Sequence, residues 1–247
     1  TLEADIFQNA GPLTGTPDGH LKMNGDSWAF GFNAGLIYEL TAATRLGIHY
    51  RSEVSHTLEG DIKYKSIHPF LQAAKGLTNK NVSAGIDLPS TFAISLAHQT
   101  SDKLTLLADI TFTKWSNFKE LAIKDDNDNP AVPVVEEKWN DVFRYSAGMK
   151  YAYNKQWTFR TGIALDKTPI DDKYRTSRIP GDDRTWLSLG TSYSPNKNLT
   201  IDVGYSHLWV EDAKINEECP LLSAAGELKG EFDSSVDILS VQATWKF

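Results

Sequence analysis

The sequence predicts an all-β fold, an antiparallel β-barrel that crosses a membrane, and three observations support this prediction. Apolar and polar residues alternate with a period of two through about ten segments. Short polar turns and long charged loops alternate along the chain as the connections between these segments. Aromatic residues gather on the apolar face close to the short turns, where the rings of membrane barrels meet the lipid headgroups.

Composition narrows the class of protein further. The 247 residues carry a formal net charge of -7, which argues against a nucleic-acid partner because such partners require a basic surface. One cysteine, Cys219, excludes an internal disulfide framework. No segment approaches the roughly 18 apolar residues of a membrane helix. The mean hydropathy of -0.37 remains compatible with a barrel, whose strands average an apolar face with a polar one.

The predicted strands follow one another in hairpins. In order they are 28–40, 45–54, 91–99, 104–113, 142–153, 157–166, 184–193, 199–209, 224–233 and 236–247. The last strand shows the pattern clearly, since Leu239, Val241 and Trp245 share a face that reaches the terminal Phe247. We interpret Phe247 as the C-terminal aromatic that the barrel-assembly machinery of the outer membrane reads.

The connections between these strands alternate in length. Short turns are predicted at 41–44, 100–103, 154–156, 194–198 and 233–235, and long loops at about 64–82, 124–138, 168–183 and 211–223. Short periplasmic turns and long extracellular loops are the layout of outer-membrane barrels. A soluble β-sandwich, in which the aromatic residues would be core, distributes its connections more evenly. The aromatic residues near the short turns are Tyr38, Tyr151, Tyr153, Trp157, Tyr193, Trp245 and Phe247.

Several segments resemble one family closely. They read GDSWAFGFNAGLIYEL, YRSEV, LPSTFAISLA, TKWSNFKEL, WTFRTGIALD, IPGDDRTWLSLGTSYS and AKINEE. In this order they are similar to the FadL family of outer-membrane transporters for long-chain fatty acids. The resemblance implies a fourteen-stranded barrel, an N-terminal hatch that plugs the lumen, and passive diffusion of hydrophobic substrates. The hatch and the first four strands have no counterpart, so residues 1–26 are expected to be an extracellular loop with the end of a preceding strand. Residues 27–247 are expected to be the C-terminal barrel strands.

Charged residues on the polar face point to a ligand site in the lumen. Counted from the short turns, Arg144, Asp166 and Arg184 fall at one height on three neighbouring strands, and Ser188 follows on the same face. Two arginines with one aspartate leave spare positive charge for a fatty carboxylate. Such charges also form networks that only satisfy one another, and this alternative stays open. The resemblance implies another role for Asp166, because the matching position in the family faces the hatch.

The long loop at 64–82 supplies a second candidate surface. Phe70 and Leu71 lie in its apolar stretch IHPFLQAAKGL and are predicted to contact the substrate first. The six histidines show no ligand spacing, and neither a metal site nor a cofactor is predicted. Ser206 and His207 are adjacent and therefore project from opposite faces of a strand, which argues against an outer-membrane lipase and against an enzyme generally.

The prediction for function is a porin-like channel in the outer membrane of a Gram-negative bacterium. It would take up long-chain fatty acids or aromatic hydrocarbons passively, in contact with outer-membrane lipid. A structural or adhesive barrel is the alternative.

Overall fold

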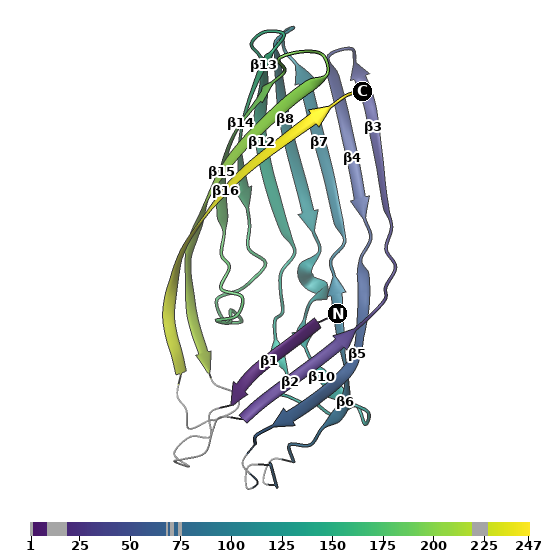
Figure 1. Cartoon of the computed structure of the whole chain (residues 1–247), viewed down its shortest axis with the longest axis vertical. Helices are drawn as coiled ribbons and strands as arrows, with labels where there is room; N and C mark the ends of the chain where they lie inside the picture. The colour runs from purple at the N-terminus through teal and green to yellow at the C-terminus, as the bar shows by residue number, and fades with distance from the viewer. Residues whose placement is uncertain (1, 9–18, 68, 70–71, 74–75, 219–226) are drawn as a thin grey trace. The chain divides into compact units, whose positions relative to one another are not determined.

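The computed structural model describes residues 2–8, 19–67, 69, 72–73, 76–218 and 227–247, which are mostly in strands (Figure 1). The chain forms two compact units. The first comprises Thr1–Phe30, Val54–Leu88 and Phe118–Glu137, and the second comprises Gly31–Glu53, Pro89–Asn117 and Lys138–Phe247. No helix among the described residues has the length and apolar character needed to cross a membrane.

Nine of the described strands form one antiparallel sheet in the second unit, in the order β16-β15-β14-β13-β12-β8-β7-β4-β3. Their bounds are β3 (Asn33–Thr41), β4 (Thr44–Arg51), β7 (Thr91–Gln99), β8 (Leu104–Thr113), β12 (Val142–Ala152), β13 (Trp157–Asp166), β14 (Arg184–Tyr193), β15 (Leu199–Glu218) and β16 (Glu227–Trp245). The predicted turns at 41–44, 100–103, 154–156 and 194–198 join neighbours at one end of this sheet, at the top of the view (Figure 1).

The apolar face of this sheet is exposed. Ile163 is 59% exposed, Leu189 is 52% exposed and Leu239 is 73% exposed, although all three lie on regular strands. A water-soluble sandwich buries such residues between two sheets. An exposed apolar surface of this extent is instead suited to hydrocarbon.

The opposite face is concave and hollow. A cavity of about 780 Å³ runs along it and is lined from both edge strands, by Ile37 of β3 and by Ile238 and Ser240 of β16. The sheet therefore curves until its edges face a common space. Glycine is required where two strands of this sheet approach closely, since a Cβ atom at Gly148 of β12 would lie 2.9 Å from the carbonyl oxygen of Thr161 in β13.

Aromatic rings gather beside the short turns, as the sequence predicts. The rings of Trp157 and Tyr193 lie 4.5 Å apart between centroids, and those of Tyr151 and Tyr153 lie 6.4 Å apart. A second group, in which Phe112 and Phe143 lie 5.1 Å apart, marks the other end of the strands. Two aromatic zones across one apolar band are typical of a membrane barrel.

Three predictions for strand boundaries are wrong. The long loop predicted at about 211–223 is strand as far as Glu218, because β15 still pairs with β16 from Ala213 to Glu218. The turn predicted at 233–235 is part of β16, because Ser234 and Ser235 pair with Val210 and Trp209 of β15. The strand predicted to begin at Trp28 begins at Asn33. Its neighbour β4 ends at Arg51, opposite Asn33, so the preceding residues find no ladder beyond the two hydrogen bonds between Phe32 and Ser52.

The first unit contains a separate five-stranded sheet in the order β1-β2-β5-β6-β10. Its strands are β1 (Leu2–Gln8), β2 (Gly19–Asp26), β5 (Val54–Lys65), β6 (Lys80–Leu88) and β10 (Ile123–Asp125), beside a small pair, β9 (Glu120–Leu121) and β11 (Val135–Glu136). Leu21 and Ile62 are buried in it. The hairpin of β5 and β6 is not among the strands predicted from the sequence, although Leu58, Ile62 and Tyr64 of β5 alternate with polar residues. Val82, Ala84 and Ile86 of β6 do the same.

Candidate functional site

Strand register brings the three predicted charged residues together. Asp166 of β13 pairs with Arg144 of β12 on one side and with Arg184 of β14 on the other. All three lie at the ends of their strands away from the short turns. This placement agrees with the heights counted from the sequence, because antiparallel pairing fixes the register once the turns are known.

The two arginines differ in their partners. Arg184 lies 3.9 Å from Asp166, between Nη1 and Oδ2, with its side chain 39% exposed. Arg144 instead lies over the ring of Trp186, at 5.3 Å from its centroid. Within the described part of the chain, Arg144 has no carboxylate at ion-pair distance. The spare positive charge of the cluster is therefore on Arg144.

The charged residues line one side of a cavity of about 410 Å³. Its apolar walls include Trp115, Val142, Pro169, Ile170, Ile179 and Trp139. The rings of Trp115 and Trp139 meet edge to face at 4.9 Å. Apolar walls with a few convergent charges are the usual make-up of a ligand pocket, and the volume falls within the range of about 300–1,000 Å³ found for such pockets.

Part of this wall comes from the loop 167–183, which is fastened by a buried arginine. Arg175 is 3% exposed and donates hydrogen bonds to the carboxylates of Asp172 and Asp182. It also donates to the backbone carbonyl of Lys214 in β15 at 3.2 Å. We call this group of contacts the Arg175 clasp. It holds the loop against β15, so that Ile170 and Ile179 keep their places in the cavity.

A second contact at the start of the loop engages another cation of the cavity wall. Asp183 accepts a hydrogen bond from the ammonium group of Lys167. This bond and the charge of Asp183 raise the pKa of Lys167 above its ordinary value. Lys167 is thus committed to a neighbour, unlike Arg144.

Ser188 faces the larger cavity on the concave face of the sheet. Its hydroxyl lies 2.8 Å from that of Ser206, either of which can donate. Arg144 lines both this larger cavity and the cavity of about 410 Å³, which we call the outer cavity. It therefore connects the outer cavity to the concave face. The predicted residues Phe70 and Leu71 lie outside the described residues.

Sequence reasoning missed the aromatic part of this site. Trp186 has the same parity as Arg184 and Ser188, so the alternation itself could have placed it beside Arg144. Trp115 and Trp139 carry no such signal, because they lie 24 positions apart and meet only through the fold.

A curved antiparallel sheet with an apolar outer face, a hollow polar inner face and aromatic zones at both ends defines the class of outer-membrane β-barrel proteins. Within this class the chain belongs to the family described as outer membrane protein transport protein (OMPP1/FadL/TodX), whose model matches residues 3–247. Its place is therefore the outer membrane of a Gram-negative bacterium.

Individual relatives agree with this assignment. The chain is 37% identical over 212 residues to a long-chain fatty acid transport protein of Escherichia coli, a match that covers 82% of this chain and 47% of the relative. It is 28% identical to a putative outer membrane protein of Neisseria meningitidis, covering 93% of this chain and 53% of the relative. The chain thus spans about half the length of the curated relatives it matches.

Solved structures show the same fold. A Pseudomonas aeruginosa FadL homologue superimposes with a TM-score of 0.83 at 26% identity, covering 98% of this chain and 60% of that one. The Pseudomonas putida toluene transporter TodX superimposes with a TM-score of 0.60 at 19% identity, covering 96% and 55% of the two chains. The second likeness shows the fold alone.

Proposed function

We propose that this chain is part of a channel that passively takes up long-chain fatty acids or similar hydrophobic compounds across the outer membrane. The observation that carries this proposal is the amphipathic cavity, in which Arg144 presents an uncommitted charge beside apolar walls. A fatty acid has matching chemistry, with an acyl chain for the tryptophan pair and a carboxylate for the guanidinium.

The two cavities suggest the direction of travel. A ligand held at the outer cavity would pass Arg144 and enter the larger cavity, whose lining of small residues includes Gly148, Gly162 and Ser188. Such a path needs no covalent step. The Escherichia coli relative is a long-chain fatty acid transport protein, and we infer that this protein is likewise a transport protein and no enzyme. Ser206 bonds within the concave face, whereas His207 bonds to Asp237 on the apolar face, so this pair does not supply a lipase nucleophile with its base.

Two partners follow from the position in the membrane. Outer-membrane lipid would cover the apolar face, and the barrel-assembly machinery would recognise Phe247 at the end of the chain. A structural or adhesive barrel would instead fill its lumen with charges that pair among themselves. The uncommitted charge of Arg144 favours the transport channel.

The decisive experiment measures binding of oleate and of dodecane to the complete protein in detergent. Arg144→Ala should weaken oleate binding by about 10- to 100-fold, because a hydrogen bond to a charged group contributes about 1.5–3 kcal/mol. Arg184→Ala should have a smaller effect, since its charge is shared with Asp166. Dodecane binding should stay unchanged in both variants.

Lys150→Ala is the matched control. It removes one positive charge from the same face of β12 but lies six residues from Arg144. Equal losses of oleate and dodecane in Arg144→Ala would remove this residue from the headgroup role, and an equal effect of Lys150→Ala would reduce that role to general electrostatics.

A further inference from the structure

The apolar face of the nine-stranded sheet carries a groove of about 470 Å³ across β12, β13, β14 and β15. Its walls are formed by Met149, Tyr151, Phe159, Leu189, Val203 and Tyr205. Thr161 lies between Met149 and Leu189 in the register and also lines the groove. Its short side chain interrupts a row of long ones, which creates the depression.

A polar cluster lies on the same face at the end of this groove. The hydroxyl of Tyr205 donates to Oδ1 of Asp237 at 2.6 Å, and Nδ1 of His207 lies 2.8 Å from the same oxygen. The other carboxylate oxygen, Oδ2, accepts no hydrogen bond from the described residues, and the side chain of Asp237 is 62% exposed. This carboxylate therefore presents an open acceptor on a surface that is otherwise apolar.

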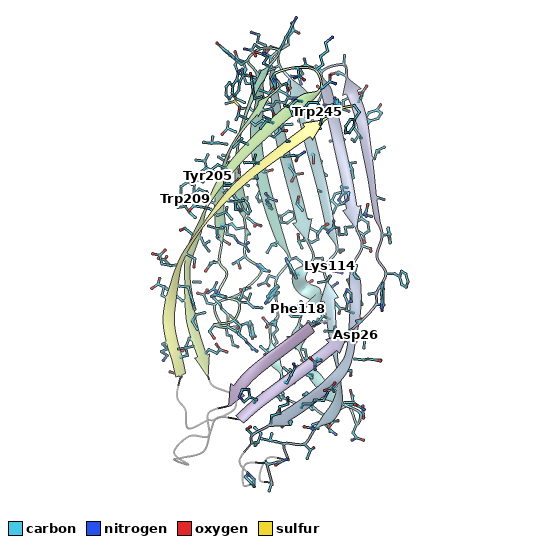
Figure 2. All side chains as sticks on the ribbon, viewed as in Figure 1. Asp26, Lys114, Phe118, Tyr205, Trp209 and Trp245 are labelled. Carbon is cyan, nitrogen blue, oxygen red and sulfur yellow. The ribbon has the colours of Figure 1, made fainter. Side chains whose placement is uncertain are left out.

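An aromatic ring completes the cluster. Trp209 packs against His207 at 4.4 Å between ring centroids and is 49% exposed. Tyr205 and Trp209 project to the same side of β15 (Figure 2). Three features therefore follow one another along β15. Tyr205 forms part of the groove wall, His207 belongs to the polar cluster, and Trp209 presents a half-exposed ring.

The height of the cluster in the membrane follows from strand length. A membrane-crossing strand has about 9–11 residues. Counted from Leu199 at the short turn, His207 and Trp209 come ninth and eleventh, at the outer boundary of the hydrocarbon. Val203 and Tyr205 lie deeper, at the level of the acyl chains.

From this arrangement we infer a binding site for a glycolipid of the outer leaflet on the external surface of β12–β16. One acyl chain fills the groove. A hydroxyl of the saccharide head donates to Oδ2 of Asp237, which is available as an acceptor because the side chain is 62% exposed. The sugar ring packs its C–H groups on the electron-rich face of Trp209. A phosphate at the same place would be repelled by the carboxylate, so the site selects the saccharide part of the head.

The test uses the complete protein in detergent, with bound lipid measured by native mass spectrometry. The probes are galactosyl diacylglycerol and a phosphatidylcholine with the same acyl chains, whose head donates no hydrogen bond. The wild-type protein should retain the galactolipid about tenfold better. Asp237→Ala should abolish this preference, and Trp209→Leu should reduce it without removing apolar character. Thr161→Phe, which fills the groove, should lower retention of both lipids.

Two matched controls accompany these variants. Asp233→Ala removes a carboxylate from the same strand outside the cluster, and Ala34→Phe adds a ring to the apolar face at the opposite edge of the sheet. Neither should change retention. Equal retention of both probes by the wild-type protein would overturn the saccharide site. An effect of Ala34→Phe as large as that of Thr161→Phe would overturn the groove, because binding would then be general to the apolar face.

Discussion

At the outer end of β12, Arg144 keeps its charge available because Asp166, its pairing partner across the strands, is already engaged with Arg184. The ring of Trp186 supports the guanidinium without neutralising it. Arg144 of β12 and Arg184 of β14 are thus the same residue type but differ in their partners, since Arg184 alone has a carboxylate at ion-pair distance. The difference arises from contacts and not from residue type.

Replacing Asp166 tests whether this carboxylate occupies Arg184 and leaves Arg144 to bind the ligand. Asp166→Asn should release Arg184 and raise oleate affinity of the complete protein about two- to fivefold, because a partly exposed pair contributes about 0.2–1 kcal/mol. Isothermal titration calorimetry measures the change. If Asp166 holds the hatch that the family resemblance implies, the affinity should stay constant while dye leakage through the barrel in vesicles rises. A lower affinity would contradict both roles.

Among the elements, the loop 167–183 determines whether the cavity has a wall. It has no strand of its own, and its shape depends on the Arg175 clasp and on Ser177, whose backbone N–H and hydroxyl both donate to Glu217 of β15. Ile170, Ala213 and Ile215 are buried beneath these contacts. The polar contacts fix the position of the loop, and the apolar ones stabilise it.

Loss of the clasp should open this loop and leave the sheet intact. Arg175→Ala removes the partner of Asp182, whose side chain is only 16% exposed, and breaking such a largely buried pair costs about 3–5 kcal/mol. Limited trypsin digestion should then cleave after Lys173 and Arg178 faster than in the wild-type protein, with heat-modifiable gel migration unchanged. Arg175→Lys keeps the charge but not the planar fork and should give an intermediate rate. An unchanged cleavage rate in Arg175→Ala would show that the clasp does not hold the loop.

For the molecule as a whole, the separation of two faces along every strand of the main sheet is the feature that defines its environment. Ile94 and Ser95 are adjacent in β7, yet Ile94 is exposed on the apolar face and the Ser95 hydroxyl donates to Asp109 at 2.6 Å on the concave face. One residue of displacement therefore separates a hydrocarbon environment from a polar cavity.

An arginine at each of these two positions should show the difference. Ile94→Arg should destabilise the complete protein in lipid vesicles by about 2–4 kcal/mol, as expected for a cation near the bilayer midplane. Ser95→Arg should have little effect, since the cavity is open and Asp109 lies beside it. Urea unfolding followed by tryptophan fluorescence measures both. Equal destabilisation would argue that the two faces do not meet different solvents.

Much of the fold was predictable because the alternation of apolar and polar residues is a local signal. The heights of Arg144, Asp166 and Arg184 followed from counting back to short turns whose position the sequence indicates well. The prediction of a turn at 233–235 was wrong because the sequence Asp-Ser-Ser is typical of turns. In the structure these residues lie within β16, where Ser234 and Ser235 pair with β15, a strand far longer than a membrane requires. The cavity-lining residues Trp115, Trp139 and Ile170 could not be predicted by counting from turns, because only the packing of the folded chain brings them together.

The hairpin of β15 and β16 has a consequence of another kind. Its two strands contain 20 and 19 residues, about twice what a bilayer needs, and they continue as a paired ribbon past the end of β14 (Figure 1). The projecting ribbon keeps its outline through its own backbone ladder. An antibody raised against the native cell surface would accordingly recognise this region as a conformational epitope and lose it on a denaturing blot.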